Sequence, residues 1–262
     1  PGVPGRNHAT NQTLTFRSLA HLSAPVIYRP PVRRTYVRMP VCPFPTDRGS
    51  RDAVSQSAAV KARSMIRRAR AAEREPIAQL LGDAFMADPV SAWVFPDEAH
   101  RREVHPRFFG VFLDAALRDG WVDVTDDLSA AACWIPVPAG GSDGEHDDIG
   151  ERLAAADPGN ERTRIVGRMT EEVHPTDRPH YYLPAIVVTP ARPGQGLGTA
   201  LLSATLERCD REGAGAYLEA SSARSKALYE RLGFASTGKT VELPGGPPMW
   251  PMWREPADRP PL

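Results

Sequence analysis

The chain has 262 residues, of which 41% are hydrophobic and 24% charged, and its 32 Lys and Arg balance its 32 Asp and Glu. These fractions are typical of a soluble globular protein, and no run of 18 apolar residues is present, which excludes a membrane-spanning helix. The three cysteines, Cys42, Cys133 and Cys209, lie far apart and form no CxxC pair. They exclude a disulfide scaffold and suggest no metal site, so we expect a reducing, cytoplasmic setting.

Charge is distributed unevenly along the chain. Residues 1–64 contain ten Lys or Arg but only two Asp or Glu, hold eight of the 27 prolines, and show no helical or strand periodicity. Such a segment cannot bury enough apolar surface to offset the entropy of ordering, so it is predicted to be disordered. Its composition fits a transit peptide or a basic arm for nucleic acid, but we favour an over-extended reading frame whose true start is Met65 or Met39. Nucleic-acid and membrane partners are not expected.

From Met65 onward, strands and helices alternate. In chain order the patterns predict a strand at 65–69, helices at 73–85 and 100–117, strands at 121–125 and 130–135, a loop at 136–144, a helix at 163–173, a strand at 180–188, a helix at 196–211, a strand at 216–220, a helix at 223–232, and strands at 234–241 and 249–254. This order is typical of one α/β domain, predicted to cover 65–257 and to leave a short tail at 258–262.

Prolines mark irregular points within this pattern. Pro106 either kinks the second helix or opens its second half, because proline lacks the N–H that a helix interior needs. Pro89 and Pro96 interrupt the chain around 90–95. Pro184 lies inside the most hydrophobic strand, where it predicts a bulge or an unpaired edge.

The stretch 187–202 (VVTPARPGQGLGTALL) carries the clearest chemical signal, because a buried strand leads through a glycine-rich loop into a helix. Glycines let the backbone approach a ligand closely, and a helix N-terminus offers free N–H donors and the positive end of its dipole, which favours phosphate. A glycine-rich turn that merely starts a helix explains the loop equally well. The P-loop and dinucleotide fingerprints do not fit, since the Lys-Ser/Thr pair is absent and the glycines fall at 194, 196 and 198.

Two segments resemble the signature motifs of the GNAT N-acetyltransferase superfamily. Residues 193–198 (PGQGLG) are similar to its acyl-CoA loop, written Q/R-x-x-G-x-G/A, and residues 228–234 (LYERLGF) resemble its second motif at the expected distance. Further similarity to the branch containing puromycin N-acetyltransferase lies in AFMADPV at 84–90, HPTDRPHYYL at 174–183 and WPMWREP at 250–256. The resemblance implies the GNAT acyl-CoA N-acyltransferase fold, an α/β fold with a mixed central sheet of about six to seven strands flanked by helices.

The resemblance also implies acetyl-CoA as co-substrate, no metal, and a set of functional residues. Those implied to bind the cofactor are Ile186, Val187, Val188, Gly194, Gln195, Gly196, Leu197, Gly198, Thr199 and Ser225. Tyr229 is implied to protonate the departing thiolate, with a core aromatic as the alternative at this helical position. Glu219 is a candidate general base, with a hydrogen-bonded structural carboxylate as the alternative. His174 and His180 are further candidates, and the base stays open.

The implied activity is transfer of an acetyl group to a primary amine of a small molecule, by direct attack in a ternary complex. The branch suggests an aminonucleoside or another antibiotic as acceptor, and a protein or peptide amine is the alternative. By the same resemblance, Trp93 and Phe95 are candidates for the acceptor pocket. Two departures from the family pattern, Pro193 for Gln or Arg and Ser225 for Asn, keep open a CoA-binding regulatory domain with impaired catalysis. The sequence leaves monomer and homodimer open.

Overall fold

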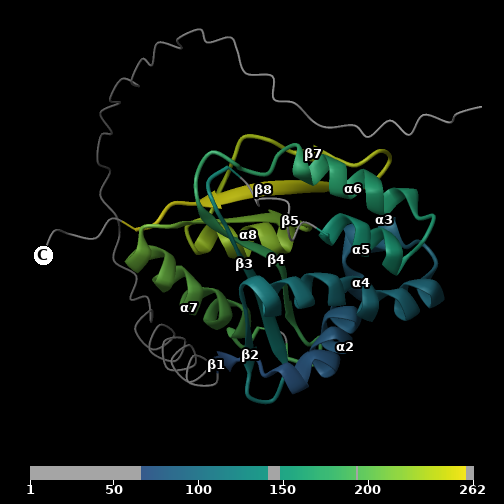
Figure 1. The fold of residues 1–262 in the computed structure, drawn as a ribbon, viewed down its shortest axis with the longest axis horizontal. Helices are drawn as coiled ribbons and strands as arrows, with labels where there is room; N and C mark the ends of the chain where they lie inside the picture. The colour runs from purple at the N-terminus through teal and green to yellow at the C-terminus, as the bar shows by residue number, and fades with distance from the viewer. Residues whose placement is uncertain (1–65, 141–147, 193, 258–262) are drawn as a thin grey trace, which may run out of the picture. The chain divides into compact units, whose positions relative to one another are not determined.

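A computed structural model of the chain describes residues 66–140, 148–192 and 194–257 (Figure 1). The expected extension 1–64, the expected tail 258–262, and Met65, Pro193 and residues 141–147 lie outside the described residues. What the sequence predicts for those segments, including the effect of Pro193 on the glycine-rich loop, stays a prediction.

The described strands form one mixed sheet. They are β1 (Ile66–Arg68), β2 (Trp121–Thr125), β3 (Ala130–Val137), β4 (His180–Val188), β5 (Gly215–Ala220), β6 (Ala235–Ser236), β7 (Val241–Glu242) and β8 (Pro248–Arg254). Their order in the sheet is β1-β2-β3-β4-β5-β8-β6, and β7 also pairs with β8. Neighbouring strands are antiparallel except β4 and β5, which are parallel and therefore need a helical crossover between them.

Helices cover both faces of this sheet (Figure 1). They are α2 (Arg74–Ala84), α3 (Pro89–Val94), α4 (Glu98–Asp119), α5 (Ile149–Ala156), α6 (Glu161–Glu171), α7 (Leu197–Glu212) and α8 (Ala223–Arg231), with the 3-10 turns η1 (Ala71–Glu73) and η2 (Phe85–Ala87). On one face, Leu201 of α7 and Tyr229 of α8 pack into a core with Leu218 of β5. On the other face, Leu81 of α2 and Leu113 of α4 pack against β2 and β3.

A third cluster of buried side chains ties the first helices to the last strands. Val94 of α3 and Val104 of α4 lie with Val241 of β7 and Met249 of β8. These segments are far apart in the sequence, so their burial together fixes where α3 lies relative to the end of the sheet.

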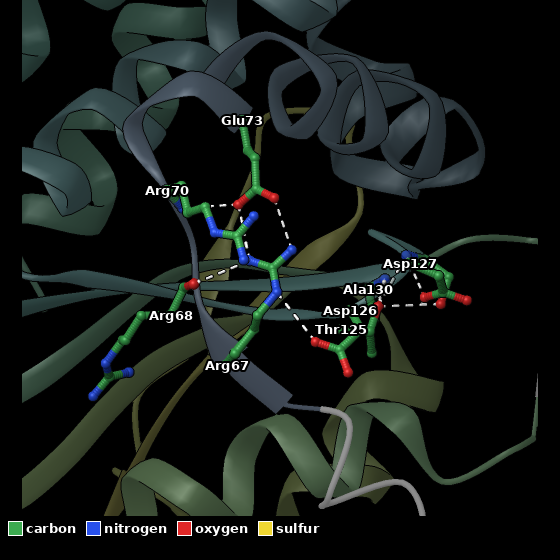
Figure 2. A network of polar contacts seen from close by, with 9 residues as sticks. Arg67, Arg68, Arg70, Glu73, Thr125, Asp126, Asp127 and Ala130 are labelled. Carbon is green, nitrogen blue, oxygen red and sulfur yellow. Dashed lines mark hydrogen bonds and ion pairs between the residues drawn. The ribbon is translucent and has the colours of Figure 1, made fainter.

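Charge anchors the short edge strand β1 to the turn that leads into α2. Arg67 donates two hydrogen bonds to the Glu73 carboxylate, at 2.7 and 2.9 Å, and a third to Asp126 at 3.1 Å (Figure 2). Glu73 also accepts the backbone N–H of Arg70 at 2.8 Å. The hydrogen bonds from Arg67 and Arg70 lower the pKa of Glu73 to about 2, so this carboxylate stays ionised at neutral pH.

The sequence predicted an interruption of the chain around 90–95, and this was wrong, because the structure has the helix α3 there. The Asp88 carboxylate caps this helix by accepting the backbone N–H groups of Val90 and Ser91, each at 3.0 Å. Pro89 occupies the first turn, where its missing N–H costs nothing. Pro106 likewise does not begin a second helix, because α4 runs through it as one element.

Two further regions differ from the predicted elements. The predicted strand 234–241 is split into β6 and β7, because the chain turns between them with Gly238 at a φ of +83°. This division brings the sheet to eight strands, slightly more than expected. The acidic segment near 150 contains α5, which the sequence pattern missed; its Arg152 reaches across to Asp114 of α4 at 2.6 Å.

Cys133 and Cys209 are free thiols, and both are fully buried. Burial raises the pKa of Cys133 to about 12 and that of Cys209 to about 11, so neither is a thiolate at neutral pH. Both act as small core residues. Among the described helices, none has the length and apolar character required to cross a membrane.

Candidate active site

The two parallel strands at the centre of the sheet separate along their length. Backbone pairing joins β4 to β5 at three positions: His180 with Gly215, Tyr181 with Ala216, and Tyr182 with Tyr217. Beyond them, β4 continues to its end paired only with β3, while β5 continues paired with β8. The second half of β4 therefore presents backbone hydrogen-bonding groups to an opening in the sheet and not to another described strand.

A β-bulge in β4 lies where this opening starts. Between the β4 residues that pair with Ile135 and Cys133 of β3, β4 has two residues, Leu183 and Pro184, whereas β3 has one. The irregularity predicted from Pro184 is thus confirmed. Proline fits here because it has no N–H to donate to a ladder.

The bulge also changes which face the side chains of β4 meet. Before it, Tyr181 and Leu183 pack into the core under α7, whereas after it Ala185 and Val187 pack into the core under α2 and α4. An extra residue shifts the alternation of a strand by one position, which accounts for this reversal. The side chains that follow the bulge, from Ala185 to Val188, are small or aliphatic.

The glycine-rich loop ends at the first turn of α7, beside the end of β4. Gly194 and Gly196 both have a φ of +75°, a conformation that L-residues rarely adopt. Gly196 precedes the helix, and no side chain caps the helix N-terminus. The backbone N–H groups of Leu197, Gly198 and Thr199 therefore lack helical partners and can donate to an anion. The Leu197 side chain is buried in the core, so only its backbone is available.

Gly198 is a glycine that the protein's own packing does not require. A Cβ at this position would meet Leu228 and Val188 at 3.6 and 3.8 Å, which is ordinary van der Waals contact, and its φ is not in the left-handed region. Glycine weakens a helix relative to alanine, and at this position it leaves space for a ligand to approach the backbone closely.

An ion pair holds the loop in place. Arg192 lies 2.7 Å from the Asp127 carboxylate in the turn between β2 and β3. Figure 2 shows Asp127 in this turn, next to Asp126. Hydrogen bonds within the turn, first from Ser129, and the charge of Arg192 lower the pKa of Asp127, so the pair is ionised at neutral pH.

Tyr229 of α8 is 6% exposed and packs against Phe234 with ring centroids 5.8 Å apart. Burial raises the pKa of its hydroxyl, and the nearby charge of Asp88 adds to this effect. Tyr229 is therefore a core aromatic whose hydroxyl keeps its proton at neutral pH.

Asp88 links the first helices to the end of β5. The Ser221 hydroxyl donates to the Asp88 carboxylate from the loop between β5 and α8. Burial raises the pKa of Asp88, against the opposing effect of this hydrogen bond and those from the α3 backbone. Sequence analysis missed this residue, although Asp before Pro is a recognisable helix-start signal.

Glu219 of β5 lies just past the last pairing with β4, on the face opposite α7, and its side chain is 5% exposed. Its Oε2 accepts the Tyr182 hydroxyl at 3.0 Å, while its Oε1 is buried without a hydrogen-bond partner among the described residues. His174 and His180 lie beside it, with their Nε2 atoms 3.1 Å apart. The structure thus brings together three residues that the sequence considered separately as bases.

Other predicted site residues lie in less accessible places. Ser225 belongs to a capping box at the start of α8, where its hydroxyl donates to the Ser222 carbonyl at 2.9 Å. Phe95 is 1% exposed and packs edge-on against His105 and Phe108, so it is a core residue and not part of a pocket. Trp93 is only partly buried, and the guanidinium of Arg162 lies 5.0 Å from its ring. Within the described ranges, no group of three or more His, Cys, Asp or Glu is arranged to hold a metal.

Comparison with known proteins agrees with this geometry. Residues 121–234, which contain the opening, the glycine-rich loop and Tyr229, match the acetyltransferase (GNAT) family. A structure from Corynebacterium glutamicum, described as a histone acetyltransferase and related acetyltransferase, is similar at 25% identity with a TM-score of 0.56, covering 74% of this chain and 97% of that one. Arylalkylamine N-acetyltransferase 2 from Aedes aegypti shares the fold at 14% identity and a TM-score of 0.50, covering 72% and 97%.

Proposed function

Because residues 121–234 match the acetyltransferase (GNAT) family, we propose that this acyltransferase moves an acetyl group from acetyl-CoA to a primary amine of a small molecule. The observation that carries the proposal is the opening between β4 and β5 beside the uncapped, glycine-rich start of α7. Both substrates would meet in this opening, and holding them together lowers the barrier mainly through entropy. The catalytic domain is proposed to be 65–257.

Two parts of the site suit the two ends of acetyl-CoA. The N–H groups from Gly194 to Thr199, with Gln195 and the positive end of the α7 dipole, would bind the pyrophosphate. The backbone of Ile186, Val187 and Val188 would hydrogen-bond the amide groups of the pantetheine arm, since it faces no other described strand. Ser225 is retained as a contact of the cofactor, although its hydroxyl is already used in the capping box.

The chemistry proposed is direct attack of the amine nitrogen on the thioester carbonyl. Backbone N–H groups exposed past the bulge in β4 would stabilise the negative charge that develops on the carbonyl oxygen. The C–S bond then breaks, and Tyr229 is placed in the role of donating its hydroxyl proton to the departing thiolate, which its raised pKa allows. The carboxylate of Glu219, next to the start of the opening, would attract the ammonium form of the acceptor.

The acceptor class proposed first is an aminonucleoside such as puromycin, because of the sequence resemblance to that branch. The test uses the full chain with acetyl-CoA and a panel of puromycin, an aminoglycoside, spermidine, tryptamine and a short peptide with a free N-terminus. Thiol release is followed with a chromogenic disulfide, and acetyl-CoA binding is measured separately by calorimetry.

The outcomes separate the alternatives. Thiol release with one class of small amine supports the proposal and names its acceptor. Release with the peptide alone moves the acceptor to protein or peptide amines. Acetyl-CoA binding with no release contradicts catalysis and favours the regulatory CoA-binding domain, and absence of binding contradicts both.

A further inference from the structure

A closed cluster of hydrogen-bonding side chains lies where β4 and β5 separate, on the sheet face opposite α7. It consists of His174, which follows α6, His180 and Tyr182 of β4, and Tyr217 and Glu219 of β5. The His180 residue is 2% exposed and the Glu219 side chain 5%, whereas the His174 side chain is 20% exposed. His174 is therefore the member that a molecule arriving from solvent can reach.

The hydrogen bonds of His180 determine which nitrogen of each histidine carries a proton. His180 Nδ1 lies 3.1 Å from the carbonyl oxygen of Arg178, which can only accept, so Nδ1 carries the proton. Burial lowers the pKa of His180, which keeps the ring neutral and makes its Nε2 an acceptor. The His174 Nε2, 3.1 Å away, must then be the donor. In neutral His174, Nδ1 is left with a lone pair.

That lone pair faces another acceptor. His174 Nδ1 lies 3.8 Å from Glu219 Oε1, too far for a hydrogen bond, and Oε1 has no hydrogen-bond partner among the described residues. The buried Tyr217 hydroxyl interacts with the Glu219 carboxylate, but without the geometry of a good hydrogen bond. The Nδ1 lone pair of His174 is therefore the acceptor in this gap that faces no donor, and a group that brings a proton to it would be stabilised by the carboxylate behind.

We propose that the acceptor amine loses its proton in this gap, with His174 Nδ1 as the proton acceptor, His180 as the residue that positions it, and Glu219 as the counter-ion. This inference rests on the proposed acetyl transfer. It assigns the general base, which the sequence left open, to His174. The hydrogen bond from His174 to His180 determines which nitrogen of His174 can accept the proton.

The proposed steps balance in protons and electrons. The substrate enters as an ammonium ion; one N–H bond breaks, its electron pair stays on nitrogen, and His174 becomes an imidazolium paired with the Glu219 carboxylate. The free amine attacks the thioester carbon and forms the C–N bond, and the C–S bond breaks. Tyr229 gives its proton to the departing thiolate, and the second proton released by the nitrogen restores the Tyr229 hydroxyl. His174 then returns its proton to solvent through its exposed edge.

The other charged groups around His174 do not compete for this proton. Arg178 lies over the Trp253 ring at 4.0 Å and is paired with Glu255 at 2.9 Å, so its charge is neutralised. Burial and the charge of Glu219 raise the pKa of Tyr182 well above its usual value, and burial does the same for Tyr217. Both tyrosines therefore remain neutral donors near the carboxylate.

This arrangement favours primary amines. One N–H of the ammonium is needed for His174 Nδ1, with the buried Glu219 carboxylate beside this ring as counter-ion, and the other two face solvent and the thioester. In an N-methylated amine, a methyl group replaces one of these N–H groups and adds bulk beside His174. We therefore expect the N-methylated form of a good acceptor to lose at least tenfold in kcat/KM.

The test compares the full-length wild type with His174→Ala, using the panel amine that gives the fastest thiol release. We expect His174→Ala to lower kcat by about 100-fold or more with an unchanged KM for acetyl-CoA, as for loss of a proton acceptor. Added imidazole should restore kcat at least tenfold. The matched control is His100→Ala, since His100 is exposed and pairs only with Asp157; it should neither lose activity nor respond to imidazole.

A second variant tests the positioning role. His180→Phe removes the acceptor that orients His174, so kcat should fall by about tenfold without imidazole rescue, while KM for acetyl-CoA stays the same. If His174→Ala does not fold, His174→Gln carries the test, with loss of the fall in kcat at acidic pH as the supporting result.

Three results would overturn the inference: wild-type kcat in His174→Ala, a folded but inactive His174→Ala that imidazole does not restore, or an unchanged pH profile in His174→Gln. If the wild type itself releases no thiol with any amine, the proposed function fails first, and this inference falls with it. The two failures are thus distinguished by the wild-type measurement alone.

Discussion

At the scale of single residues, burial decides the chemical state of the groups around the opening. Tyr229 has its pKa raised mainly by burial, so its hydroxyl keeps its proton at neutral pH. His180 has its pKa lowered by burial and is neutral, which fixes the proton positions in its neighbour. Both pKa shifts follow from the low polarity of the surroundings, which disfavours the charged form. They have opposite signs because deprotonation charges a tyrosine, whereas protonation charges a histidine.

We predict that Tyr229→Phe lowers kcat by about 10- to 1000-fold and leaves the Kd of acetyl-CoA nearly unchanged, because only the proton donor is lost. The ring contact with Phe234 is kept. Steady-state thiol release and calorimetry measure the two quantities. The control is Tyr181→Phe, whose hydroxyl bonds Glu212 on the α7 side of the sheet. Equal turnover in Tyr229→Phe and the wild type would remove Tyr229 from the mechanism.

At the scale of elements, the start of α7 contains features that weaken the helix. Its first turn has no side-chain cap and contains Gly198 where alanine would fit. Both features weaken a helix, and both leave backbone N–H groups open toward the loop. A substitution can therefore change helix stability and ligand binding in opposite directions.

Gly198→Ala provides that measurement. We expect the unliganded protein to become more stable, by up to about 1 kcal/mol, because alanine favours the helix and meets no close contact. The Kd of acetyl-CoA should rise at least tenfold, because the new methyl group occupies the space beside the free N–H groups. Denaturant titration and calorimetry give the two values. An unchanged Kd would show that the phosphates bind elsewhere.

The helix α3 depends on a buried carboxylate. Asp88 caps α3 and also accepts the Ser221 hydroxyl, so one side chain connects the first helices to the loop before α8. Burial raises the pKa of Asp88 above its unfolded value. The folded state thus favours the protonated acid, and the stability contributed by this group falls as pH rises through the raised pKa.

We predict that Asp88→Asn is at least as stable as the wild type at pH 7, since asparagine caps helices equally well and carries no buried charge. The advantage of the variant should shrink as pH is lowered toward the ordinary pKa of aspartate. Asp88→Ala, which also loses the cap, should cost about 1 kcal/mol at neutral pH. Denaturant unfolding at several pH values measures both effects. If the stability of Asp88→Asn relative to the wild type were lower at pH 7 than at pH 4, the buried charge of Asp88 would not be destabilising.

At the scale of the whole molecule, the sheet is divided into two parts that pair only at the start of β4 and β5. The core under α7 contains residues of both parts, and it lies on the opposite face from the core under α2 and α4. A ligand that enters between the strands contacts both parts. Its binding should therefore stabilise the folded domain as a unit.

We expect acetyl-CoA at about 100 times its Kd to stabilise the fold by about 2.7 kcal/mol. For a domain of this size, this corresponds to a rise in Tm of roughly 5 to 10 °C. S-acetylpantetheine at the same concentration lacks the pyrophosphate and should give a clearly smaller rise. Thermal unfolding followed by circular dichroism makes the comparison, and equal shifts would exclude a contribution from the phosphate loop.

Much of this architecture could be predicted from the sequence because its signals are local. The alternation of apolar residues indicated β4, α7 and α8 within one residue of their ends, and Pro184 indicated the bulge. The glycines at 194 and 196 indicated a backbone that only glycine adopts readily. Weak or short patterns were less informative, as in α3, α5 and the divided strand near Gly238.

The sequence by itself thus determined the fold class, the glycine-rich turn before α7 and the position of Tyr229 on α8, since each depends on neighbours within a few residues along the chain. Only the tertiary structure decided that Ser221 meets Asp88, 133 positions away, and that His174 Nδ1 lies 3.8 Å from Glu219 Oε1. Such contacts arise when distant strands and helices bury their apolar faces together. The polar groups at their edges are brought into contact by that burial, and no local pattern in the chain specifies which ones meet.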